Sequence, residues 1–404
     1  MIKDKDIVII SIQPWDIEIG SNCKNIALEF AKENRVLYVN PPMDRITRLK
    51  QENTERIQKR ICIAKGQKPD LEQIGDNLWN LYPKDTIESI NWIGSHTIFK
   101  ILNKYNSKLL ANNIKSATNR LGFSDYILFN DSSMFLGLHL KELLQPNIYA
   151  YYIRDYLVKV PYWKKHGEAI EPSLIKQADV ILNNSTFFAE YGSQFNKNSI
   201  MVGQGCDIEM FNDEENCIKI PNEFKDIPSP VIGYVGSLTT IRLDIDLLEY
   251  IAKQKPDWSI VLVGPEDEKF KNSGLHKLPN IFFLGSKDSQ DLPAYIKGFD
   301  ISINPQVVND VTIGNYPRKI DEYLAMGKPV VATQTKAMEM FSQYVYLGKT
   351  KDDYVTLIEN ALNEHSESKA KERIKFAKSH TWEKNVHEIY KAIKKSTKNK
   401  MSWS

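Results

Sequence analysis

The chain has 404 residues, of which 42% are hydrophobic and 26% are charged, and its formal net charge is +2. These values are typical of globular proteins and exclude disordered and collagen-like classes. The length suits two domains of about 200 residues each, and the small net charge argues against a protein that neutralises many nucleic-acid phosphates.

The N-terminal sequence, MIKDKDIVIISIQ, enters a short apolar run directly. This run is too short for a signal-peptide core and has no small-residue cleavage site. No stretch reaches the roughly 18 apolar residues of a membrane span, so we expect a cytoplasmic protein. No Cys-x-x-Cys or His-x-x-x-His pattern occurs, so we expect free thiols and no metal site. The cysteines are Cys23, Cys62, Cys206 and Cys217.

In the first half, short β-branched apolar runs alternate with helical patterns, which predicts βαβ units and a parallel sheet. A helix is expected at Asn22–Lys32, after a loop that contains Gly20 and Ser21. The predicted strands are Ile7–Ile12, Val36–Asn40, Tyr126–Asn130, Ile148–Tyr152 and Val180–Asn183.

Residues 90–123 contain no acidic residue and combine basic with apolar side chains, and the stretch from Arg45 to Lys68 is also net basic. A basic amphipathic stretch with an aromatic residue fits contact with anionic lipid headgroups. The alternative is a solvated helix face. The basic residues are Lys100, Lys104, Lys108, Lys115 and Arg120, beside Trp92, Ile93, Phe99, Ile101 and Leu102.

Acidic residues follow two of the predicted strands. Asp155 follows Ile148–Tyr152, and Asp131 follows Tyr126–Asn130. A carboxylate at a strand end that faces a cleft can serve as a general base. For Asp155 the alternative is a pairing with Arg154 or a helix cap, and for Asp131 it is a helix N-cap.

Residues 212–230 are acidic, contain prolines and lack a hydrophobic period, which is typical of a linker. We therefore predict an N-terminal domain at 1–211 and a C-terminal domain at 231–380, with a ligand cleft at the carboxyl ends of both sheets. The second set of predicted strands is Val231–Val235, Ser259–Val263, Ile281–Leu284, Ile301–Asn304, Pro329–Thr333 and Tyr344–Leu347.

The loop after Val231–Val235, in GYVGSLTTIRLD, has features of a phosphate site. Gly236 allows close backbone approach, and Arg242 could supply a bidentate partner. An ordinary tight turn without a ligand is the alternative.

A stronger pattern is NPQVVNDVTIGNYPRKIDEYLAMGKPVVAT. Pro317 is expected in the first turn of a helix that Gly327 ends. Lys319 and Glu322 would share one face of this helix. A lysine near a helix N-terminus is unfavourable unless an anion binds there, and the carboxylate could accept hydrogen bonds from a ribose diol. A solvated Lys319–Glu322 pair is the alternative.

The string PRKIDEYLAMGKPVVAT resembles the donor-binding segment of family-4-like GT-B glycosyltransferases, also called group 1. VIGYVGSL, PDWSIVLVGP, LPNIFFLG and LPAYIKGFDISINP resemble successive strands of that family's C-terminal domain. QADVILNNSTFFAEYG, GQGCDIEMF and HTWEKNVHEIYKAI resemble further landmarks, so the resemblance covers most of residues 170 to 395. The last of them resembles a helix, here 381–398, that completes the N-terminal domain.

The resemblance implies two Rossmann-like domains that face each other across a cleft. It implies that Lys319 contacts the donor diphosphate, that Glu322 contacts the nucleotide ribose, and that Gly236 and Arg242 approach the phosphates. Turns that line the nucleobase pocket would contain Gly264, Gly285 and Ser286. Asp155 resembles a strand-end aspartate of bacterial exopolysaccharide transferases, and Gly20 and Ser21 resemble a loop near the acceptor.

The implied function is a metal-independent hexosyltransferase without a cofactor, which uses a nucleotide-sugar donor and a glycan or lipid-linked acceptor in surface polysaccharide synthesis. Gly314 occupies a position where many retaining members carry a glutamate, with Thr312 and Asn315 nearby. This departure leaves the stereochemistry open. It also leaves open a non-catalytic GT-B-like subunit, and a nucleotide-sugar epimerase is a further alternative. A dehydrogenase is disfavoured because the first strand lacks a Gly-x-Gly-x-x-Gly turn.

Overall fold

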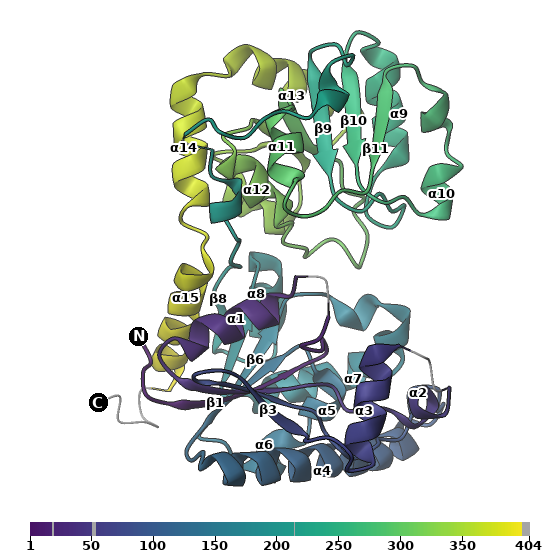
Figure 1. Cartoon of the computed structure of the whole chain (residues 1–404). Helices are drawn as coiled ribbons and strands as arrows, with labels where there is room; N and C mark the ends of the chain where they lie inside the picture. Colours follow the sequence, from purple (N-terminus) through teal and green to yellow (C-terminus); the bar gives the residue numbers. More distant parts are fainter. Residues whose placement is uncertain (18–19, 51–53, 214, 398–404) are drawn as a thin grey trace. The chain divides into compact units, whose positions relative to one another are not determined.

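The computed structural model describes residues 1–17, 20–50, 54–213 and 215–397 (Figure 1). The chain divides into two compact units, Met1–Gly203 with the C-terminal segment from Asn385, and Gln204–Lys384. The division therefore lies before the linker predicted at residues 212–230, which belongs to the second unit. Helix α15 (Trp382–Ser396) begins in the second unit and continues in the first.

The first unit is built on an eight-stranded sheet with the order β3-β4-β2-β1-β5-β6-β7-β8. Neighbouring strands are parallel except for β3 and β4, which are antiparallel. The strands are β1 (Asp6–Ser11), β2 (Arg35–Val39), β3 (Leu71–Gly75), β4 (Leu78–Leu81), β5 (Ile127–Asp131), β6 (Ile148–Ile153), β7 (Val180–Asn183) and β8 (Ser199–Met201).

The predicted strands of the first half are present, and their ends lie within about one residue of the prediction. β1, β5, β6 and β7 are buried along their whole length, as expected for strands covered by helices on both faces. β3, β4 and β8 were not predicted. β3 has the sequence LEQIG and no fully buried residue, so it lacks the apolar run on which the prediction depends.

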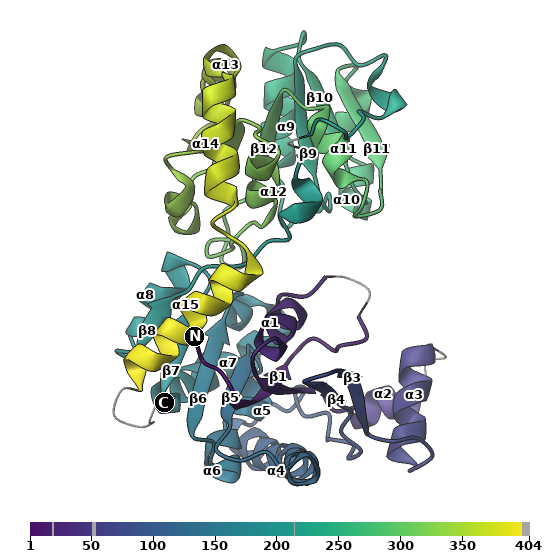
Figure 2. The ribbon, with the colours of Figure 1, turned by 60° about the vertical axis from the view of Figure 1, so that its left-hand side comes forward.

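Helices cover both faces of this sheet (Figure 1). Leu110 of α4 and Leu174 of α7 pack in one core cluster with strand residues. On the opposite face, Phe30 of α1 stacks on Tyr390 of α15, with ring centroids 5.3 Å apart. Figure 2 shows α15 beside the N-terminus, where Lys394 Nζ donates to the Met1 carbonyl over 2.9 Å. The helices are α1 (Asn22–Ala31), α2 (Arg45–Lys50), α3 (Glu55–Ala64), α4 (His96–Leu121), α5 (Met134–Gly137), α6 (Leu140–Leu144), α7 (Pro161–Gln177) and α8 (Thr186–Ser193).

The second unit contains a six-stranded parallel sheet with the order β11-β10-β9-β12-β13-β14. The last strand begins at Tyr346 rather than at the predicted Tyr344, because the amide of Tyr344 donates to the carbonyl of Phe341 in the preceding 3₁₀ turn. The strands are β9 (Val231–Val235), β10 (Ser259–Val263), β11 (Ile281–Gly285), β12 (Ile301–Asn304), β13 (Val330–Thr333) and β14 (Tyr346–Gly348).

Helices also cover both faces of the second sheet (Figure 1). Leu248 of α9 and Ile358 of α13 share one core cluster, and Ile296 of α11 and Leu324 of α12 share another. Because the strands are parallel, all their carboxyl ends emerge at one edge, where loops can bind a ligand. The helices are α9 (Ile245–Gln254), α10 (Glu268–Lys271), α11 (Leu292–Lys297), α12 (Lys319–Ala325), α13 (Lys351–Glu364) and α14 (Glu367–Ala377).

Candidate active site

Glycines occupy the carboxyl ends of three adjacent strands in the second unit. Gly236 follows β9 with φ 137°, Gly264 follows β10 with φ 148°, and Gly285 ends β11 with φ 71°. The amide of Gly236 donates to the Val263 carbonyl over 2.9 Å, and the amide of Gly264 donates to the Gly285 carbonyl over 2.8 Å. A Cβ on Gly264 would lie 1.9 Å from the Gly236 carbonyl oxygen. The strand ends therefore form a floor of bare backbone that a ligand can approach closely.

Lys319, the first residue of α12, extends to this floor. Its Nζ donates to the Tyr234 hydroxyl over 2.6 Å and lies 4.4 Å from the centre of the Tyr234 ring. A Cβ at Gly236 would lie 3.0 Å from the same Nζ. Within the described part of the chain, Lys319 forms no ion pair with a carboxylate. An ammonium without a counter-ion beside bare backbone is suited to bind an anion.

Glu322 is largely buried, with 8% of its surface exposed. It accepts a hydrogen bond from Arg318 Nε over 3.1 Å. Burial raises the pKa of Glu322, and the charges of Arg318 and Lys319 partly offset this increase. The solvated Lys319–Glu322 pair considered as an alternative is not formed, since each of these residues has another partner.

Several contacts that sequence reasoning missed fix the position of α12. Asp321, which is fully buried, accepts hydrogen bonds from the Tyr316 hydroxyl and pairs with His380 Nδ1, both over 2.7 Å. The Tyr323 hydroxyl accepts a hydrogen bond from the Val235 amide over 2.8 Å. Pro317 lies before the helix rather than within its first turn, and its carbonyl accepts from the Ile320 amide. These contacts place Lys319 at the end of β9.

The other predicted donor residues are more exposed. The Arg242 side chain is exposed and forms no ion pair within the described residues, while its carbonyl accepts from the Val307 amide over 2.9 Å. Ser286 is also exposed, directly after Gly285. Both side chains are therefore free to contact a ligand, but neither touches Lys319 in any described contact.

The loop around Gly314 is held by its own side chains. The Thr312 hydroxyl donates to the Val307 carbonyl and accepts from the Asn309 amide. The Asn309 carboxamide oxygen accepts from the amides of Val311 and Thr312. The Thr312 hydroxyl is thus used to shape the loop.

In the first unit, Arg154 connects the two predicted catalytic aspartates. Asp131, the last residue of β5, is fully buried and accepts from Arg154 Nε and from the Ser11 hydroxyl, both over 2.8 Å. Arg154 Nη1 donates to Asp155 over 2.9 Å, and the Asp155 side chain is 38% exposed. Asp131 is therefore not a helix N-cap, whereas the Arg154 pairing expected as an alternative for Asp155 is present. Only Asp155 is accessible to a substrate.

The loop after β1 is held in place by hydrogen bonds to Gln13. The Ser21 hydroxyl is buried and donates to Gln13 Oε1 over 2.7 Å, and the Tyr38 hydroxyl donates to the Gln13 carbonyl over 2.7 Å. Gly20 is exposed. Ser21 therefore positions the loop through Gln13, and the backbone at Gly20 is open to a ligand.

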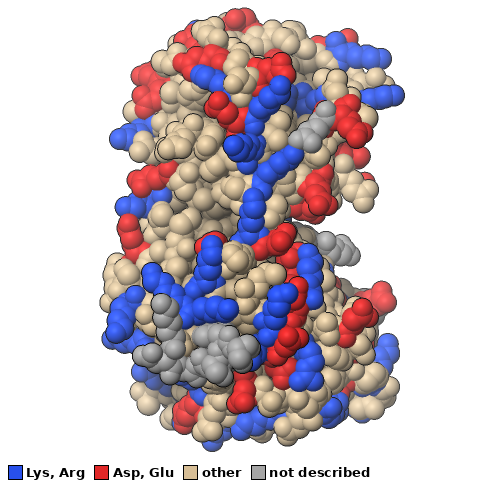
Figure 3. All heavy atoms as spheres, turned by 90° about the vertical axis from the view of Figure 1, so that its left-hand side faces the viewer, with Lys and Arg blue, Asp and Glu red and all other residues tan. Residues whose placement is uncertain are grey.

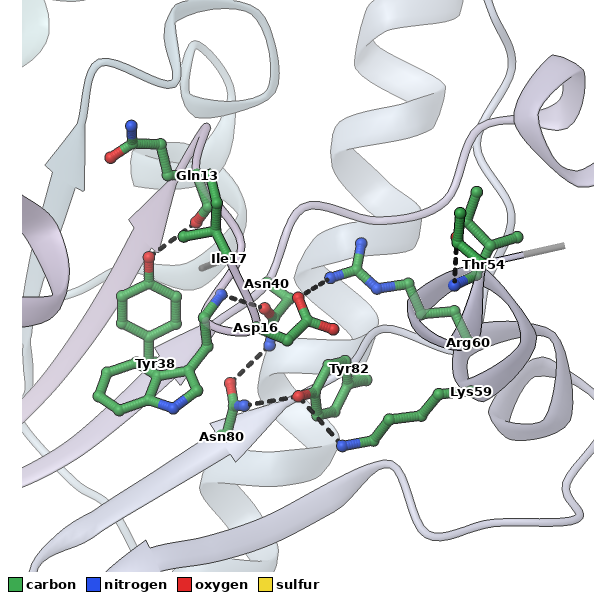
Figure 4. Close-up of polar contacts among 12 residues, drawn as sticks. Gln13, Asp16, Ile17, Tyr38, Asn40, Thr54, Lys59, Arg60, Asn80 and Tyr82 are labelled. Atoms are coloured by element: carbon green, nitrogen blue, oxygen red, sulfur yellow. Dashed lines mark hydrogen bonds and ion pairs between the residues drawn. The ribbon is translucent and has the colours of Figure 1, made fainter. Parts of the chain in front are cut away.

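A second polar network, which the sequence did not reveal, lies at the ends of β2 and β4 (Figure 4). The Asn40 side chain accepts from the Trp15 amide over 2.8 Å and donates to Asn80. Asp16 pairs with Arg60 of α3 over 2.9 Å. These contacts connect distant segments, and they hold the loop after β1 against α3.

Comparisons with known proteins find a family match within the second unit. Residues 229–363 match the family Glycosyl transferases group 1. A stretch of 170 residues is 32% identical to TuaH of Bacillus subtilis (strain 168), assigned as a teichuronic acid biosynthesis glycosyltransferase. This match covers 40% of the chain and 42% of TuaH, so the chain spans less than half the length of that relative.

Solved structures resemble the whole chain. Sucrose-phosphate synthase from Thermosynechococcus elongatus superposes with a TM-score of 0.65 at 15% identity, covering 97% of this chain and 98% of its own. HepE of Anabaena, in complex with UDP, superposes with a TM-score of 0.66 at 12% identity, covering 96% of this chain and 100% of its own. Likeness at this level of identity shows a shared fold.

Proposed function

We propose that this chain, a member of the group 1 glycosyltransferases through residues 229–363 and of the GT-B fold, transfers a sugar from a nucleotide-diphosphate donor. The acceptor we propose is a glycan or a lipid-linked glycan of a surface polysaccharide. The relation to TuaH supports this acceptor class, and the UDP and UDP-glucose complexes of HepE support UDP-sugars as the first donors to test.

The observation that carries this proposal is the Lys319 ammonium beside Gly236. Its position allows it to neutralise diphosphate oxygens while the backbone of Gly236 and Gly264 lies against them. When the glycosidic bond to the donor breaks, negative charge grows on the departing diphosphate, and a fixed cation stabilises that charge most strongly in the transition state. We propose that Glu322 accepts hydrogen bonds from the ribose diol and that no divalent metal is needed.

The proposal is tested first by thermal unfolding with a panel of nucleoside diphosphates. A ligand at 100 times its dissociation constant should add about 2.7 kcal/mol to the free energy of unfolding. We expect one diphosphate, UDP in the first instance, to raise the melting temperature equally in magnesium and in EDTA. No response to any diphosphate would contradict a donor site, and a response only in magnesium would contradict metal independence.

We further propose Asp155 as the general base or acceptor ligand, because it is the accessible aspartate of the pair. Asp155→Asn should lower kcat about a hundredfold, since positioned general bases contribute at least this factor. The affinity for the nucleoside diphosphate should stay unchanged. Steady-state kinetics and calorimetric titration measure the two effects separately.

Asp131→Asn is the matched control for this experiment. It removes the same charge, but it leaves the Arg154 guanidinium, 10% exposed, without its buried partner. We therefore expect a loss of stability of about 3 kcal/mol. If Asp155→Asn also lost stability while retaining full kcat, Asp155 would have a structural role only.

Peripheral contact with an anionic membrane is a further proposal, supported by one face of α4. Ile98, Ile101 and Tyr105 are at least half exposed and follow helical spacing, and the lysines at 100 and 108 flank them. Exposed apolar side chains beside lysines fit the bilayer interface. Ile93 and Phe99, grouped with this surface by the sequence, are buried instead, and Arg120 pairs with Asp70. No helix among the described residues could span a membrane.

Charge reversal at this face tests the membrane proposal. The variant Lys100→Glu/Lys108→Glu should sediment at least about tenfold less with vesicles that contain phosphatidylglycerol, because each lysine near such a surface contributes about 1 kcal/mol. The control is Lys253→Glu/Lys391→Glu, which alters two lysines that pair with acidic residues. Figure 3 shows a face on which acidic and basic side chains are mixed in this way. Equal sedimentation of both double variants would refute the proposal.

A further inference from the structure

A cavity of about 640 Å³ lies in the first unit, within the size range of small-molecule sites. Its walls come from the carboxyl ends of β1 and β2, from helices α2 and α4, and from the segment at the start of α5. Sequence reasoning did not predict it, because its lining residues are spread between Ile10 and Trp163.

Polar side chains on the cavity wall from α4 are already hydrogen-bonded to the protein. Asn103 Nδ2 donates to the Phe135 carbonyl over 2.7 Å. Asn106 accepts from the Glu88 amide and donates to the Glu88 carbonyl, both over 2.9 Å. The Asn106 carboxamide is therefore engaged on both its oxygen and its nitrogen, and the Asn103 carboxamide is engaged through its nitrogen.

The polar groups on the opposite wall are similarly engaged. Asp44 accepts from the Ser89 hydroxyl over 2.6 Å and from the Thr47 amide over 3.0 Å. The Asn40 carboxamide is bonded on both its oxygen and its nitrogen (Figure 4). A sugar placed against these engaged groups would lose hydrogen bonds to water and regain few of them, which is costly. The wall that remains is apolar, with Ile10, Val39 and Leu110 among its residues.

The lining also includes large apolar side chains that are exposed to solvent. Trp92 is 73% exposed, Tyr162 is 59% exposed and Ile46 is 45% exposed. Basic side chains contact this margin: Lys165 Nζ donates to the Trp92 carbonyl over 2.7 Å, and Arg48 Nη1 donates over 3.0 Å to the hydroxyl of Thr86, which precedes the lining residue Ile87. The Glu88 carboxylate, also on the lining, is neutralised by Arg45, whose Nε donates over 2.9 Å. An apolar interior with aromatic and basic residues at its margin is complementary to an anionic amphiphile.

We propose that this cavity binds the hydrocarbon chain of a phosphate-bearing lipid, with the phosphate at the basic margin. Identifying this lipid as the carrier of the acceptor rests on the proposed function. The binding of the hydrocarbon chain does not rest on the proposed function, because it depends only on the cavity.

The test uses the full-length protein and 11-(dansylamino)undecanoic acid, whose fluorescence rises in an apolar site. We expect saturable binding, competition by farnesyl phosphate, and no competition by a soluble disaccharide or by inorganic phosphate. Ile46→Asp, which places a charge on the lining, should weaken probe binding about tenfold. Leu49→Asp is the matched control, since Leu49 is on the same helix, is 74% exposed and does not line the cavity.

Absence of saturable binding, competition by the disaccharide, or equal weakening by Ile46→Asp and Leu49→Asp would each overturn the inference. Leu136→Trp, which adds volume to another lining residue, should also weaken binding, and unchanged binding in this variant would count against it. Lys319→Ala should bind the probe normally. A protein that binds the probe but no nucleoside diphosphate would keep this inference while contradicting the proposed function.

Discussion

Lys319→Ala is expected to lower the affinity for the nucleoside diphosphate about thirtyfold and kcat/KM about a thousandfold. A charge-assisted hydrogen bond contributes about 2 kcal/mol to binding. The effect on catalysis should be larger, because the charge on the diphosphate grows as the sugar departs. Calorimetric titration with UDP and initial rates with the matching UDP-sugar measure the two losses.

Two further variants distinguish the effect of the Lys319 ammonium on UDP binding from the effects of other groups. Tyr234→Phe keeps the ring 4.4 Å from Nζ but removes the hydroxyl that holds Lys319 at 2.6 Å, so it should weaken UDP binding less than the alanine variant does. Lys253→Ala removes an exposed lysine of the same unit, paired with Glu249, and should leave affinity unchanged. Full UDP affinity in Lys319→Ala would remove the basis of the proposed function.

Much of the fold could be predicted because buried parallel strands are short apolar runs. SIVLV and VIGYV form β10 and β9 with the predicted bounds. Residues 229–363 match the predicted group 1 family, and the predicted GT-B fold is confirmed. The edge strands of the first sheet, β3 and β8, were not predictable in this way. β3 is paired on one side only, and its polar residues face solvent.

The candidate site was likewise predictable only in part. Lys319 and the strand-end glycines could be predicted because each belongs to a local pattern, a strand followed by a turn or by a helix. The hydrogen-bond partners of the site residues could not be predicted. Tyr234 is separated from Lys319 by 85 positions, and Ser11 from Asp131 by 120. Nothing in the local sequence around Asp131 indicated that Arg154 neutralises it, and the helix cap considered as the alternative role for Asp131 is not formed.

Gly264→Ala is expected to destabilise the second unit by about 3 kcal/mol and to abolish UDP binding. A Cβ at this position would lie 1.9 Å from the Gly236 carbonyl oxygen and 2.7 Å from its carbon, which are backbone atoms that cannot rotate away. The φ of 148° is also strained for a residue with a side chain. Relief requires the loop at Gly236 to move, and that loop contains the backbone beside Lys319.

Gly274→Ala is the control for this variant, because the nearest atom to its Cβ would be a Glu249 carboxylate oxygen at 3.9 Å. We expect a stability change within about 0.5 kcal/mol and normal UDP affinity for it. Urea unfolding gives both free energies, and titration at low temperature, where Gly264→Ala is still folded, separates loss of the site from loss of the fold. A folded Gly264→Ala protein that binds UDP as tightly as the parent would show that the diphosphate does not rest on the Gly236 backbone, even if Lys319 proved essential.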